Sequence, residues 1–105
     1  MLDVALRAFA EPHRREILLL TKGEELSAGE IAAHFNLTRP AISQHLRVLT
    51  DAGLLSMRRE GTRRMYQARP EKIRELMEYL NQFWESSLLR LKEAAEAEER
   101  RNSSG

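Results

Sequence analysis

The chain has 105 residues, of which 42% are hydrophobic, and a formal net charge of +1. This length predicts one small domain with a single core and leaves no room for an enzyme cleft between two lobes. The absence of cysteine excludes disulfides, thiolate metal ligands and thiol redox sensing. No apolar run approaches the roughly 18 residues that span a bilayer, and the first residues lack the pattern of a signal peptide, so we expect a cytoplasmic protein with no membrane partner.

Basic charge is concentrated in the middle of the chain. Residues 1–38 have four basic and six acidic side chains, residues 39–69 have seven arginines and two acidic side chains, and residues 70–105 have six basic and eight acidic side chains. The middle segment therefore has a net charge of +5, whereas each flanking segment has a net charge of −2. Because arginine is well suited to phosphate and guanine, this distribution favours a nucleic-acid-binding surface over an ordinary solvated one.

Two short amphipathic helices are predicted at the start of the chain. Leu2, Leu6 and Phe9 recur at helical spacing within residues 2–10, so this segment needs a partner for its apolar side. Pro12 is suited to the first position of a second helix.

The segment that follows has the pattern of a helix-turn-helix. Ser27 and Glu30 form a capping box that starts its first helix. Asn36 is expected in a left-handed conformation where the chain leaves that helix. Thr38 is a good N-cap for the second helix, which Gly53 ends.

The second of these helices is the predicted DNA-reading helix. Ile42, Leu46 and Leu49 form its buried stripe, so its polar side chains should point outward, where they can bond base edges or phosphates in a major groove. We expect four residues to read bases and two to hold phosphates. The candidate base readers are Arg39, Ser43, Gln44 and His45, the candidate phosphate contacts are Thr38 and Arg47, and Pro40 lies in the same first turn.

From residue 54 the apolar pattern changes to a period of two, which predicts a β-hairpin with its turn at residues 60–62. Arg58, Arg59, Arg63 and Arg64 flank the tip of this hairpin. A basic hairpin directly after a reading helix is a wing, which lies along the DNA backbone or enters the minor groove.

The last predicted helix covers residues 70–100 and has an apolar stripe along its whole length. At 1.5 Å per residue it would be roughly 45 Å long, so most of the stripe would face water in a monomer. The simplest way to bury this stripe is an isologous homodimer. The alternative is that the helix folds back on its own domain. The expected dimer contacts are Leu2, Leu6, Phe9, Leu80, Phe83, Trp84, Leu88 and Leu91. Residues 101–105 are expected to be a disordered polar tail.

Four segments of the chain resemble the ArsR family of bacterial winged-helix repressors: EPHRREIL, ELSAGEIA, TRPAISQHLRVLTDAGLL and RREGTRRMYQ. The resemblance covers nearly the whole chain. It implies a mainly α fold, a winged helix-turn-helix with a two-stranded wing, over residues 1–100, with dimerisation helices at 2–10 and 70–100. It also implies a homodimeric repressor that binds a double-stranded DNA operator and is usually released by an inducer.

The chain departs from the resemblance in its sensing residues. Metal-sensing members of the family often have two cysteines where this chain has Ser27 and Gly29, and others bind zinc on the last helix, where this chain has no histidine. His13, His34 and His45 are isolated in sequence, so we expect them to be structural or DNA-contacting. The sequence therefore predicts neither a metal site nor a cofactor.

Two other classes of function are alternatives to a DNA-binding repressor. In one, the protein is a regulatory interaction module whose dimer cleft or long helix binds a small ligand or a protein, with Phe83 and Trp84 lining a pocket. In the other, it is an enzyme. His13 and Glu16 lie one helical turn apart, as do Ser43 and Arg47. Both pairs lack a third orienting group and a desolvated cleft, so we expect no enzymatic activity.

Overall fold

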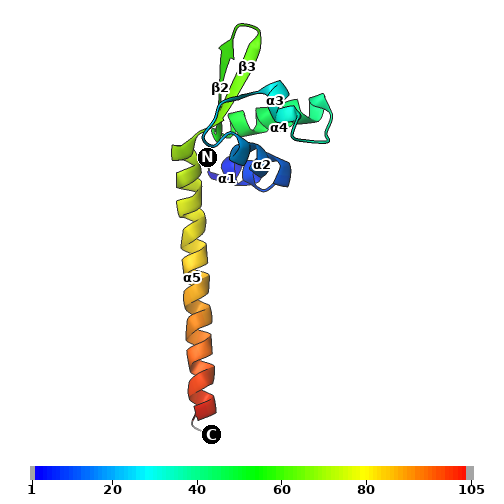
Figure 1. Ribbon diagram of the computed structural model, residues 1–105. Coiled ribbons are helices and arrows are strands. Elements are labelled where there is room, and N and C mark those ends of the chain that lie inside the picture. The colour runs from blue at the N-terminus through cyan, green and yellow to red at the C-terminus, as the bar shows by residue number, and fades with distance from the viewer. Residues whose placement is uncertain (1, 104–105) are drawn as a thin grey trace.

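The computed structural model describes residues 2–103, which form five helices and three strands. Helices α1 to α4 surround the core, the β2–β3 hairpin projects from it on one side, and α5 leaves in the opposite direction (Figure 1). The elements are α1 (Leu2–Phe9), α2 (Pro12–Leu20), β1 (Leu26–Ser27), α3 (Ala28–Ala32), α4 (Arg39–Asp51), β2 (Leu55–Glu60), β3 (Arg63–Ala68) and α5 (Pro70–Ser103).

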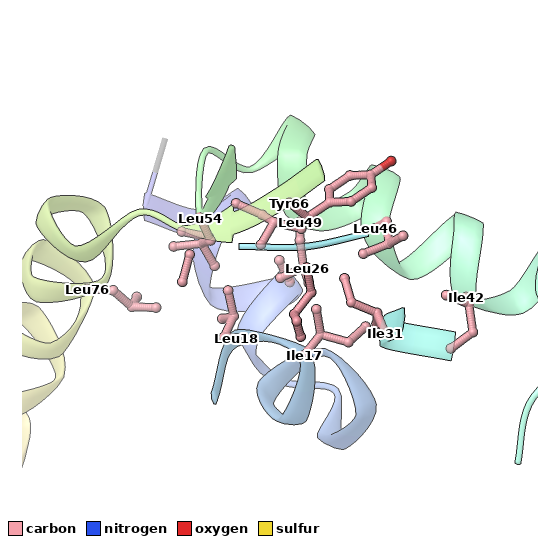
Figure 2. Packing of buried hydrophobic residues seen from close by; sticks show 14 residues of the cluster. Ile17, Leu18, Leu26, Ile31, Ile42, Leu46, Leu49, Leu54, Tyr66 and Leu76 are labelled. Carbon is pink, nitrogen blue, oxygen red and sulfur yellow. The ribbon is translucent and has the colours of Figure 1, made fainter. Parts of the chain in front are cut away.

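The core lies where α2, α3 and α4 meet the base of the sheet (Figure 2). Ile17 of α2 and Ile31 of α3 are fully buried there. The predicted stripe of α4 faces the same core, and Leu76 of α5 closes it at one end. Because the stripe of α4 is packed against this core, the residues on the opposite side of α4 remain exposed.

The capping box at the start of α3 is confirmed. The Glu30 amide donates to the Ser27 hydroxyl at 3.1 Å, and the Ser27 amide donates to the Glu30 carboxylate at 3.0 Å. The prediction for Asn36 is wrong, because Gly53 and Gly61 are the residues with positive φ within the described range 2–103. The chain leaves α3 instead through two tight turns, in which the amides of residues 34 and 35 donate to the carbonyls three residues earlier. These turns make a left-handed residue unnecessary.

The hairpin is part of a three-stranded antiparallel sheet of order β1-β3-β2. Gly61, with φ of 62°, occupies the predicted turn between β2 and β3. Strand β1 was not predicted, since two residues carry no periodicity. Its register pairs Leu26 with Tyr66 and Ser27 with Met65, which attaches the base of the wing to the start of the helix-turn-helix.

Helix α5 is 34 residues long, which corresponds to about 51 Å at 1.5 Å per residue. It projects away from the core, so the alternative in which it folds back on its own domain is wrong (Figure 1). The disordered tail is also corrected, because residues 101–103 continue the helix, while 104 and 105 lie outside the described residues. Arg100 and Arg101 favour this extension, since basic side chains in the last turn interact well with the helix dipole. Across residues 2–103, no helix combines the length and the apolar character that crossing a membrane requires.

Candidate nucleic-acid interface

The outward side of α4 presents a polar surface. Ser43, Gln44 and Arg47 are exposed, as predicted from the buried stripe on the opposite side. The Thr38 hydroxyl accepts a hydrogen bond from the Ala41 amide at 3.2 Å, which confirms Thr38 as the N-cap. Exposed Arg39 and Pro40 form the first turn. The N-terminal part of α4 can therefore approach a groove of DNA without losing core contacts.

One face of the wing faces α4. Arg59 and Arg64 are cross-strand partners, and because side chains alternate along a strand they share a face with Met57 and Tyr66. A hollow of about 440 Å³ separates this face from α4, and its lining includes Arg47, Met57, Arg64 and Tyr66. Like charges opposite one another destabilise a sheet, so the exposed Arg59–Arg64 pair is suited to a surface that meets a polyanion.

The other two wing arginines lie on the opposite face and are held by ion pairs. Arg58 donates to both carboxylate oxygens of Glu25, at 2.7 and 2.6 Å, and this pairing raises the pKa of Arg58 and lowers that of Glu25. Arg63 donates to Glu30 at 3.1 Å. The sequence interpretation treated all four arginines alike. It missed their acidic partners because 33 residues separate each pair, and the alternation of the strands was the available signal.

His45 does not belong to the exposed polar surface of α4, so its expected role as a base reader is not supported. Its side chain is only 18% exposed and faces the start of α2, where Glu11 and His13 lie. The physical reason is helical geometry, because His45 follows Ile42 by three residues and precedes Leu49 by four, which places it beside the buried stripe.

The expected dimer contacts divide into two groups. Leu6, Phe9 and Leu80 are partly buried against the core of their own chain. The remaining contacts are more exposed, at 39% for Leu2, 60% for Phe83, 62% for Trp84, 46% for Leu88 and 67% for Leu91. The middle of α5, from Phe83 to Leu91, thus presents an uncovered apolar stripe.

Taken together, the capped reading helix, the adjacent hairpin and the basic hollow between them define a winged helix-turn-helix protein. A helix-turn-helix domain family matches residues 9–58. The chain belongs to the ArsR family of transcriptional regulators, a group of DNA-binding proteins rather than enzymes.

Known proteins with similar sequences and structures are transcriptional regulators. The chain is 41% identical to the HTH-type transcriptional regulator Rv2034 of Mycobacterium tuberculosis over 86 residues, which cover 82% of this chain and 80% of that protein. It is 47% identical to the transcriptional repressor SdpR of Bacillus subtilis over 55 residues, 52% of this chain and 61% of that protein. The solved structure of an ArsR-like transcriptional regulator from Rhodococcus sp. RHA1 superimposes with a TM-score of 0.69 at 26% identity, covering 90% of this chain and 92% of that one.

Proposed function

We propose that the protein is a homodimeric repressor that binds a double-stranded DNA operator, with α4 of each copy in a major groove and the wing beside it. The observation that carries this proposal is the basic hollow between α4 and the wing, where Arg47 and Arg64 line the same concave surface. Repression is the activity that the name of SdpR states for that relative.

Within this surface the residues have different roles. Arg39, Ser43 and Gln44 are the proposed base readers, since arginine pairs with guanine and glutamine with adenine in the major groove. Arg47, Arg59 and Arg64 are the proposed phosphate contacts, joined by the N-terminus of α4 at Thr38. Arg58 and Arg63 contribute less, because an approaching phosphate would have to compete with Glu25 and Glu30.

The proposed dimer is supported by the exposed stripe of α5, which includes Trp84 and Leu88. Stripes of this kind usually mark contacts between proteins. A groove of about 480 Å³ between α1, α2 and the base of α5 offers a second contact, since its apolar lining is flanked by Arg15, Lys22 and Arg74 and includes no acidic side chain.

The charge of α5 fits this groove. Residues 85–99 have five acidic and two basic side chains and are followed by Arg100 and Arg101 in the last turn of α5, so the segment 85–99 is negative while the groove is positive. A second copy running antiparallel would place its acidic segment 85–99 over the basic groove of the first. Such a pairing is isologous, because each copy contributes both surfaces.

Selection of bound duplexes from a random oligonucleotide pool tests the proposal. We expect enrichment of a site with two related half-sites, about 10–10.5 base pairs or a multiple apart, because two reading helices related by a twofold axis meet successive turns of one DNA face. A Gln44→Ala variant should relax the preference at one position in each half-site. Failure to enrich any sequence at moderate ionic strength, where sequence-independent binding is weak, would refute operator binding. A single unrepeated half-site would refute the dimer.

A further inference from the structure

The folded chain brings together three potential metal ligands that are distant in sequence. Glu11 is the N-cap of α2, His13 lies in the first turn of that helix, and His45 lies on the flank of α4 that faces them. The ligand atoms of the three side chains all lie within 4.8 Å of one another. All three residues are half-buried.

The geometry of the cluster is defined by several short contacts. His13 Nδ1 lies 2.7 Å from Glu11 Oε1, and His45 Nδ1 lies 3.9 Å from Glu11 Oε2. The two imidazole rings are stacked with their centroids 5.7 Å apart, and the rings of Phe35 and His13 form a T-shaped contact with their centroids 5.9 Å apart. The Arg14 backbone amide donates to Glu11 Oε2 at 2.9 Å, which fixes the orientation of the carboxylate.

We propose that Glu11, His13 and His45 form a binding site for a divalent transition-metal ion of the Zn²⁺ class. Two imidazoles and one carboxylate are a common donor set for such ions, with water completing the coordination. The ion would bond to each donor at about 2.0–2.2 Å, so small side-chain rotations bring the three atoms into range. The hydrogen bond between His13 Nδ1 and Glu11 Oε1 would give way to bonds from these two atoms to the ion.

The pKa shifts of His45 and Glu11 favour the protonation states that bind metal. Burial, above all, lowers the pKa of His45. Burial alone would raise the pKa of Glu11, but hydrogen bonds from His13 and from the Arg14 amide outweigh it and lower the pKa. Neutral imidazole and ionised carboxylate are the forms that bind metal.

Arg14 would compete with the ion for Nδ1 of His45. Its guanidinium lies 3.3 Å from His45 Nδ1, and it also donates to the carbonyls of Ala8 at 2.7 Å and Arg7 at 3.1 Å. The same side chain therefore joins the end of α1 to the reading helix. Binding of a cation to His45 would displace the guanidinium from α4 and attach α4 to the start of α2 instead.

The metal site itself does not depend on the proposed function, but its consequence for DNA does. If α4 reads an operator, exchanging the Arg14 contact for a metal bond alters how the reading helix is held, and Zn²⁺ should change the affinity for the selected operator. Metal binding is measured first without DNA, so a failure of operator binding and a failure of the metal site are distinguishable.

The test is a calorimetric titration in which ZnCl₂ is added to the full chain, which has been treated with a chelator and has no polyhistidine tag. Absorption spectroscopy with Co²⁺ in place of Zn²⁺ reports the coordination. We expect one ion per chain. His13→Gln and His45→Gln should each weaken binding by more than about tenfold, since even loss of a residue that only supports a ligand costs about 10–100-fold. The matched control is His34→Gln, because His34 is the third histidine of the chain and lies outside the cluster.

A second variant tests the competition. Arg14→Gln removes a cation 3.3 Å from a ligand atom, so it should tighten Zn²⁺ binding, whereas an adventitious surface site would be unaffected. Thermal unfolding of each variant shows whether it is folded, and His13, at 44% exposure, is the substitution least expected to disturb the core. Absence of Zn²⁺ binding, or equal binding by the wild type and the folded His13→Gln variant, would overturn the proposal.

Discussion

Arg63 and Arg64 are neighbours on β3 that line one hollow near Arg39, but only Arg63 is held by an ion pair, and this contrast gives a sharp test of the proposed DNA surface. Arg64 lines the hollow beside α4, and among the described residues it has no ion-pair partner. Arg63 points to the other face of the hairpin and binds Glu30 at 3.1 Å. The variants Arg64→Ala and Arg63→Ala remove the same side chain from adjacent positions, so each is the control for the other.

The expected magnitude follows from the number of phosphates contacted. If Arg47, Arg59 and Arg64 each neutralise one phosphate, a dimer makes six such contacts, and log K should fall with log salt with a slope of about −5.4. Arg64→Ala removes two contacts per dimer and should reduce the slope to about −3.6. Between 50 and 200 mM salt the wild type should lose about 2,000-fold in affinity and the variant about 150-fold.

Fluorescence anisotropy with a labelled operator, measured over a range of salt concentrations, gives the slope directly. Arg63→Ala should leave it close to the wild-type value. Arg64→Ala should weaken binding to cognate and random duplexes by a similar factor, because phosphate contacts carry no sequence information. The reasoning about strand faces would be wrong if Arg63→Ala flattened the salt dependence as much as Arg64→Ala.

Three further predictions concern the dimer, the reading helix and the capping box. Trp84→Glu should dissociate the dimer in sedimentation experiments, since Trp84 is 62% exposed, which corresponds to at least about 100 Å² per copy, or about 5 kcal/mol per dimer when covered. The control Gln82→Glu lies off the stripe and should leave the dimer intact. An unchanged dimer for Trp84→Glu would refute the interface. Gln44→Ala should cost about 1–3 kcal/mol at one operator base pair while leaving affinity for random DNA unchanged, and equal loss on both duplexes would exclude Gln44 as a base reader. Ser27→Ala should lower the free energy of unfolding in urea by about 1 kcal/mol through loss of the N-cap, with exposed Ser86→Ala as the neutral control.

Local rules predicted most of the fold because each element has its own signals in the sequence. The capping box at Ser27, the N-cap at Thr38 and the glycine turn at Gly61 occur where those signals place them. The errors occur where one local signal is compatible with more than one backbone conformation. Asn36 failed because tight turns after α3 replaced the left-handed residue, and the end of α5 was missed because extending an existing helix requires no new nucleation.

The functional surface was less predictable than the fold, since it depends on contacts between distant residues. The sequence correctly placed Ser43, Gln44 and Arg47 on the outside of α4. It did not reveal that Glu25 and Glu30 hold two of the four wing arginines, because no local pattern joins positions 33 residues apart.

His45 shows how one residue can be misread when composition is given more weight than geometry. A histidine among polar residues of a reading helix resembles a base contact, yet its spacing from Ile42 and Leu49 already placed it on the inward flank. The fold then sets this flank against the first turn of α2, where Glu11 and His13 lie. The same helix therefore presents one surface suited to DNA and, on its opposite flank, a cluster of donors suited to a metal ion. An ion bound at the proposed site would change the contacts that hold α4 against α2, and because the outer surface belongs to the same helix, we expect the affinity for DNA to depend on the ion.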